Sequence, residues 1–129
     1  PHAGGWQEAG IPRRGQEWNN PPIVTVGPRH SGDLPARYSF LEVSPDNVNV
    51  SVLKKAEDSD DLLLRCYDST GSSCTARITL ADPLKVDAVH TTDLLENSQA
   101  ECPSQGTTFQ VPVGAWSIET LRLIRDPRR

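Results

Sequence analysis

Apolar and polar residues alternate most regularly between Asn47 and Tyr67. Two alternating series, Val48–Ala56 and Leu62–Asp68, flank the acidic run Asp58-Ser59-Asp60-Asp61. A period of two residues is typical of a half-buried strand, and a short run of polar, turn-forming residues is typical of a hairpin loop. The pattern therefore predicts one β-hairpin with a solvated acidic tip, next to which Lys54-Lys55 is strand-end charge.

The same alternation continues on both sides of this hairpin, between turns marked by Gly, Pro, Asn or Asp. It predicts further strands at Ile23–Val26, Arg37–Val43, Cys74–Leu80, Lys85–Val89 and Thr92–Glu96, and a closing hairpin made of Phe109–Val113 and Trp116–Arg125. Residues 97–107 are interpreted as a loop. The apolar phase slips between Ile118 and Leu121, which predicts a β-bulge near Glu119-Thr120.

About seven or eight short strands with frequent turns are typical of an all-β fold, here an antiparallel β-sandwich. No strand is apolar on both faces, which argues against a parallel α/β sheet. We expect the sandwich to occupy residues 23–126, before a frayed tail at 127–129. Residues 1–22 differ, because Pro12 and Gly15 interrupt any helix started at Trp6. This segment is interpreted as an irregular N-terminal arm or linker with one helical turn.

Composition narrows the class of protein. The 129 residues carry a formal charge of −4 without a basic stripe, which argues against nucleic-acid binding. No apolar run is long enough to span a bilayer and no signal peptide is present, so we expect a cytoplasmic protein with no membrane partner. The chain begins at Pro1 and contains no methionine, which we interpret as a fragment of a longer protein.

The three cysteines, Cys66, Cys74 and Cys102, do not form a regular disulfide framework. Cys66 and Cys74 fall on the apolar phase of neighbouring predicted strands. We favour two small buried side chains, and a cross-strand disulfide that leaves Cys102 unpaired is the alternative. No Cys-x-x-Cys pair exists, which excludes a zinc ribbon.

The sequence predicts no catalytic, cofactor-binding or metal-binding residue. His2, His30 and His90 lack the spacing of paired metal ligands. His2 lies beside Trp6 in a glycine-rich segment, which fits an interdomain turn better than a sugar site. The tip acids are explained by a turn, and Glu42, Glu96 and Glu119 are scattered on outward phases. Trp116 and Tyr67 are candidate sugar-stacking rings, although a sugar-binding module usually presents several aromatic side chains together.

Three segments, in order along nearly the whole chain, carry a family resemblance. The first is Pro1–Gly10, followed by Asn19-Asn20-Pro21. The second is Asn47–Asp58 with Leu62–Tyr67, and the third is Asp93–Glu96 with Ile118–Leu123. Together they resemble the C-terminal end of family 38 glycoside hydrolases, the α-mannosidases. The chain departs from the family pattern at Gly5, Pro12 and Cys66, where Asp, a helical region and an aliphatic residue are more usual.

The resemblance implies a parent enzyme that hydrolyses α-mannosidic bonds of mannose-containing glycans with retention. In this family the zinc ion and the aspartate nucleophile lie in an N-terminal α/β barrel, and no zinc-type His-x-Asp occurs in this chain. We therefore expect a non-catalytic C-terminal domain whose partners are the other domains of the parent, with a homo-oligomer as a further option. The alternatives are a stand-alone carbohydrate-binding sandwich and an immunoglobulin-like adhesion module.

Overall fold

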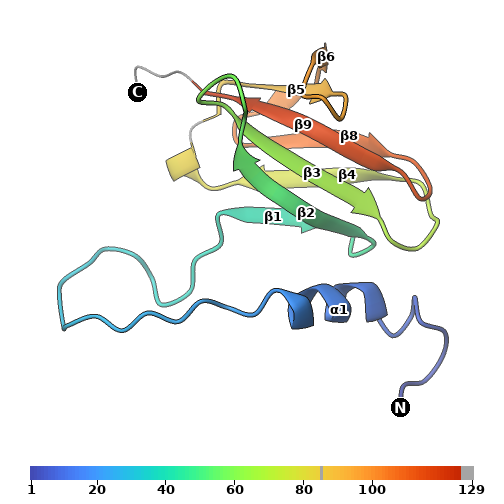
Figure 1. Ribbon diagram of the computed structural model, residues 1–129, viewed down its shortest axis with the longest axis horizontal. Helices are drawn as coiled ribbons and strands as arrows, with labels where there is room; N and C mark the ends of the chain where they lie inside the picture. The colour runs from blue at the N-terminus through green and yellow to red at the C-terminus, as the bar shows by residue number, and fades with distance from the viewer. Residues whose placement is uncertain (85, 126–129) are drawn as a thin grey trace. The chain divides into compact units, whose positions relative to one another are not determined.

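The computed structural model describes residues 1–84 and 86–125, which form two compact units, one of residues 1–38 and one that begins at Ser39 (Figure 1). The first unit contains α1 (Ile11–Asn19), so the prediction of a single helical turn is wrong. Pro12 lies in the first turn of the helix, where a backbone N–H is not needed for helical hydrogen bonding. The Glu17 carboxylate forms ion pairs with Arg13 Nε at 3.3 Å and with Arg14 Nη1 at 2.9 Å.

The strand predicted at Ile23–Val26 is wrong, because these residues form no strand and the side chains of Ile23 and Val26 are 93% and 97% exposed. β-Branched residues favour strands mainly when a neighbouring strand gives them a surface to pack on. The domain boundary predicted after residue 22 stays a prediction, although the compact units divide after Tyr38. The predicted tail at 127–129 lies outside the described residues.

The second unit is an antiparallel β-sandwich, which confirms the predicted fold class. One sheet has the order β1-β4-β8-β7, and the other has the order β2-β3-β9-β5-β6. In sequence order the described strands are β1 (Leu41–Ser44), β2 (Val48–Lys55), β3 (Leu62–Asp68), β4 (Cys74–Leu80), β5 (Ala88–Thr92), β6 (Ser98–Glu101), β7 (Ser104–Gln105), β8 (Thr108–Val113) and β9 (Ile118–Ile124), with a short 3-10 helix at Asp82–Leu84.

The core between the sheets is aliphatic and is drawn from the inward phase of both sheets. Leu64, Leu121 and Leu123 come from the five-stranded sheet, and Ile78 and Phe109 come from the four-stranded sheet. Each of these side chains is at most 2% exposed. Alternation along the strands therefore supplies two inner faces that interdigitate, as in other sandwiches.

The hairpin β2–β3 is confirmed, with Lys55 opposite Leu62 and Val48 opposite Asp68. The predicted closing hairpin is wrong, because β8 and β9 belong to different sheets. The strand predicted at Arg37–Val43 is shorter than expected, because β1 starts only at Leu41. The strand predicted at Thr92–Glu96 is wrong, because Asp93 begins a turn in which its N–H donates a hydrogen bond to the Asn97 carbonyl. The predicted loop at 97–107 contains β6 and β7.

The bulge predicted near Glu119-Thr120 is wrong, since β9 keeps an unbroken register with both β3 and β5. Ile118 is 58% exposed and lies on the outer phase with Thr120, so no change of phase is required. The bulge occurs instead in β2, between Val50 and Val52, at Ser51.

Candidate functional site

The acidic hairpin tip contacts Arg122 of β9. The Arg122 Nε donates to Asp61 Oδ2 at 2.9 Å, and the same guanidinium donates to Asp58 and to the Ser59 hydroxyl. The side chains of Arg122 and Asp61 are only 13% and 15% exposed. The prediction of a solvated tip is therefore wrong for Asp61, whereas Asp60 is 72% exposed.

Two ion pairs of Lys54 extend this arrangement across the sheet surface. Lys54 Nζ lies 2.6 Å from a Glu57 carboxylate oxygen and 2.7 Å from one of Glu96. Glu96 also accepts the Glu57 N–H at 3.0 Å, which joins the hairpin to the turn after β5. Lys54 is the penultimate residue of β2, as the strand-end interpretation predicted, and its charge is paired with both carboxylates. We call these residues the Arg122 cluster: Lys54, Glu57, Asp58, Ser59, Asp61, Glu96 and Arg122.

The Arg122 cluster explains the burial of Leu63, which the alternating pattern places on the outer face. Leu63 is 1% exposed although it is not part of the core between the sheets. Its partners in the strand register are Lys54 on β2 and Arg122 on β9. Long basic side chains can cover apolar surface with their aliphatic stems while their charges remain paired. The cluster therefore forms a small second layer over the outer face.

Within the Arg122 cluster, the pKa values of Asp61, Glu96, Lys54 and Arg122 are shifted toward the charged forms of these side chains. Burial would raise the pKa of Asp61, but hydrogen bonds from the Arg125 backbone, Ser59 and Arg122 lower it. The hydrogen bond from Lys54 lowers the pKa of Glu96, and bonds to Glu57 and Glu96 raise that of Lys54. A general acid of a glycosidase needs a raised carboxyl pKa. The cluster is thus suited to stabilising the fold rather than to proton transfer.

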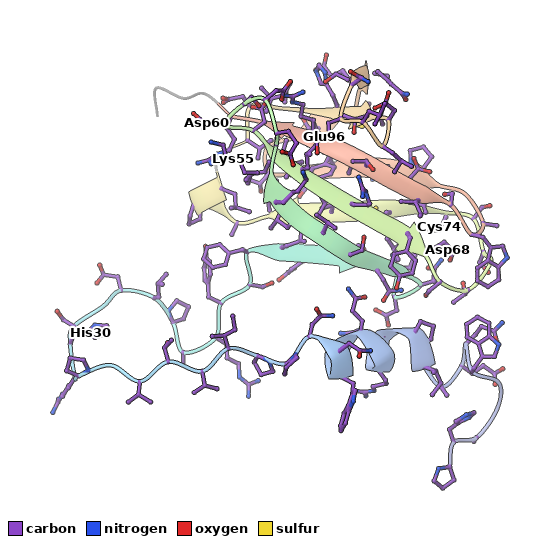
Figure 2. The ribbon with its side chains drawn as sticks, viewed as in Figure 1. His30, Lys55, Asp60, Asp68, Cys74 and Glu96 are labelled. Carbon is purple, nitrogen blue, oxygen red and sulfur yellow. The ribbon has the colours of Figure 1, made fainter. Side chains whose placement is uncertain are left out.

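Asp68, at the end of β3, organises the opposite end of the sandwich (Figure 2). Its side chain is buried, with 3% of the residue exposed. The carboxylate accepts hydrogen bonds from the Asn47 amide at 2.8 Å, the Thr70 N–H and hydroxyl at 3.1 Å, and the N–H groups of Gly71 at 2.6 Å, Ser72 at 3.1 Å and Trp116 at 3.0 Å. One carboxylate therefore fixes the β3–β4 loop and the β8–β9 turn together.

Burial would raise the pKa of Asp68, but the bonds from Trp116, Asn47, Thr70 and Gly71 outweigh it and hold that pKa far below its usual range. Sequence reasoning missed both Asp68 and Arg122. The available signal was limited: Asp68 ends a strand before Ser69-Thr70-Gly71, and Arg122 is a lone cation on the outer phase of an apolar strand.

The remaining candidate groups do not converge on a reactive site. Glu119 lies opposite Cys66 and accepts the Ser117 hydroxyl at 2.9 Å, so its predicted outward phase is wrong. His30 is exposed beside the Ser31 carbonyl, and His90 pairs with Glu101 in the strand register. Within residues 1–84 and 86–125, no three His, Cys, Asp or Glu side chains are grouped as a metal site would require. The described residues therefore do not fit a zinc site.

The cysteines of the described chain are free, so the alternative disulfide is not formed. Cys66 is fully buried, as predicted, whereas Cys74 is half-buried and packs against the same core. Burial raises the pKa of the Cys66 thiol to about 11, with a contribution from Glu119. A thiol with this pKa is almost entirely protonated at neutral pH and is a poor nucleophile.

Two hollows of about 280 and 230 Å³ lie on the four-stranded sheet and share Arg77. Both linings mix polar and apolar side chains, with Gln110, Thr108 and Phe109 in the first and Glu42 and Val43 in the second. Glu42 is the only carboxylate that lines either hollow, so they offer no pair of acids for glycoside hydrolysis. No helix among the described residues has the length and apolar character needed to cross a membrane.

Comparison with known proteins identifies this sandwich. The profile described as "Glycosyl hydrolases family 38 C-terminal beta sandwich domain" matches residues 47–121, from the turn before β2 into β9. The chain is also similar to "Alpha-mannosidase G" of Dictyostelium discoideum, with 24% identity over 128 residues. That alignment covers 98% of the chain but only 12% of the relative. The resemblance inferred from the sequence is confirmed: the chain belongs to the C-terminal β-sandwich domains of glycoside hydrolase family 38.

Proposed function

We propose that this chain is the C-terminal structural domain of a retaining α-mannosidase, which hydrolyses α-mannosidic bonds in mannose-containing glycans. The match over residues 47–121 carries the proposal, because it coincides with the core of the sandwich. In this proposal the zinc ion and the nucleophile belong to other domains of the parent, and those domains are the partners of this one. A cytoplasmic location and a homo-oligomer formed through the parent remain predictions.

The proposal that the domain itself is non-catalytic is supported by how its acids are used. Asp61 and Glu96 are paired with Arg122 and Lys54, and Asp68 is buried among hydrogen-bond donors. All three have lowered pKa values, which keeps them ionised and unable to protonate a leaving group at neutral pH. Their interactions tie loops to strands, as a supporting domain requires.

The purified chain should release no product from an aryl α-mannoside, with or without added Zn²⁺. A full-length family 38 α-mannosidase, assayed in parallel, provides the positive control. Turnover that copurifies with the chain through successive columns would contradict the non-catalytic assignment.

The structural role is tested in the intact parent protein with Asp68→Asn. We expect a lower thermal midpoint and a shorter half-life, because the variant loosens two turns of this domain. The KM of the enzyme that remains folded should equal that of the wild type. A tenfold change in KM at unchanged stability would show instead that the domain contributes directly to substrate binding.

A further inference from the structure

Trp116 is held in an unusual backbone conformation at the end of the sandwich organised by Asp68. Its φ of +58° lies in the left-handed region, which is costly for a bulky residue. The Trp116 N–H donates to Asp68 at 3.0 Å, and the flanking Ala115 N–H donates to the Ser73 hydroxyl at 3.0 Å. The Ser117 N–H closes the turn on the Gly114 carbonyl at 3.1 Å. These bonds fix the backbone from which the indole projects.

The indole lies directly on the backbone of Gly71. A Cβ atom built at Gly71 would lie only 2.5–2.6 Å from three atoms of the Trp116 ring, so no other residue fits beneath it. Gly71 also has a φ of +79°, which L-residues rarely adopt. Trp116 is nevertheless 61% exposed. One part of the ring is therefore supported by the protein while a large part faces solvent.

The side chains of the two connections around this ring are small and mostly hydroxylic. The loop between β3 and β4 carries Thr70, Ser72 and Ser73, and the turn between β8 and β9 carries Ser117. Both connections lie at the same end of the sandwich (Figure 1), where Figure 2 labels Asp68. The Asp68 charge is satisfied by its hydrogen bonds and does not face an incoming ligand.

We propose that the Trp116 turn and the Ser69–Ser73 loop bind a neutral pyranose ring. An indole face is electron-rich, so it attracts the weakly positive C–H groups on one side of a sugar ring. Thr70 and Ser117 already donate their hydroxyls to Asp68 and Glu119, so the exposed hydroxyls of Ser72 and Ser73 are the ones placed to bind the sugar hydroxyls at the rim, Ser73 as a donor because its oxygen accepts the Ala115 N–H. A charged ligand would find no unpaired counter-charge on Asp68. This contact lies outside the proposed structural function and holds whatever the parent enzyme hydrolyses.

A sugar is favoured over a protein partner by the small apolar area. Ile118 is the exposed aliphatic residue nearest to Trp116 in the chain, and hydroxyl side chains dominate the two connections. A stable protein interface would require a far larger surface. With one supporting ring, we expect a Kd on the order of 1 mM, much weaker than that of modules with several aromatic side chains.

The test is a titration of the full 129-residue chain with methyl α-mannopyranoside, followed by ¹H–¹⁵N correlation spectra. The chain contains three tryptophans, so we expect three indole N–H signals. We expect shifts at the Trp116 indole and at the amides of Gly71–Ser73 and Ala115–Ser117. Trp116→Ala should reduce the affinity at least tenfold. Trp18→Ala removes a tryptophan that is 86% exposed on α1 and should leave the affinity unchanged.

Gly71→Ala provides a second variant, because it keeps the indole but displaces it from its support. Its affinity should fall in the same direction as that of Trp116→Ala, while signals of core residues such as Leu121 stay at their wild-type positions. The proposal is overturned if mannoside shifts no signal, or if the shifts persist at full size in Trp116→Ala. It is also overturned if concentration-dependent shifts without sugar show that Trp116 mediates self-association.

Discussion

At the scale of single residues, Asp68 has more structural consequence than any candidate that the sequence suggested. One buried carboxylate accepts bonds from the β1–β2 connection, the β3–β4 loop and the β8–β9 turn. Replacing Asp68 with Asn removes the negative charge. It also places an NH₂ donor opposite N–H groups that need an acceptor. We expect a loss of about 2–3 kcal/mol in the free energy of unfolding, since hydrogen bonds to a charged group are among the stronger ones.

Chemical denaturation of the Asp68→Asn chain measures this loss. The matched control is Asp60→Asn, which removes an exposed carboxylate paired only with Lys55 among the described residues and should leave the midpoint unchanged. Equal midpoints for wild type and Asp68→Asn would refute the view that this residue organises the end of the sandwich. The sequence could not predict this role of Asp68, because the groups that donate hydrogen bonds to its carboxylate lie up to 48 residues away in the chain.

At the scale of elements, the Arg122 cluster joins β2, the hairpin tip and β9 into one unit. Arg122→Ala leaves Asp61 without its cation and uncovers Leu63, so we expect a loss of about 2 kcal/mol in unfolding free energy. Arg122→Lys keeps the charge but not the forked donors, and its loss should be intermediate. Thermal unfolding of both variants tests this, with Arg77→Ala as the control at an exposed arginine of the other sheet. A loss as large in Arg77→Ala would disprove a specific contribution of the cluster.

Local patterns predicted the elements that depend on neighbours in sequence. The hairpin β2–β3 and the bounds of β3 and β4 follow from alternation and turn residues alone. The crossing from β8 to β9 was mistaken for a hairpin, because a tight turn looks the same whether the next strand pairs or changes sheet. Ile23–Val26 and β6 were misassigned for a related reason: strand formation depends on a partner strand that the local pattern does not name.

At the scale of the whole molecule, the family was predictable whereas the interactions that stabilise the domain were not. The ordered segments identified family 38 from residues that the structure now places in β2, β3, β9 and the turn after β5. Lys54, from the second of those segments, and Glu96 and Arg122, from the two parts of the third, meet in one cluster. What looked like separate sequence similarities therefore describes a single three-dimensional arrangement.

The stability of the whole chain should depend on pH mainly on the acid side. Asp61 and Asp68 have pKa values lowered by folding, so the folded state favours their ionised forms. Their contribution is fully present above the unfolded aspartate pKa of about 3.9 and is lost as the pH falls through the lower folded values. Thermal midpoints should be nearly constant between about pH 5 and 7 and should decrease below about pH 4. In Asp68→Asn this decrease should be shallower, and an identical slope would show that Asp68 gains no net stabilisation from its donors.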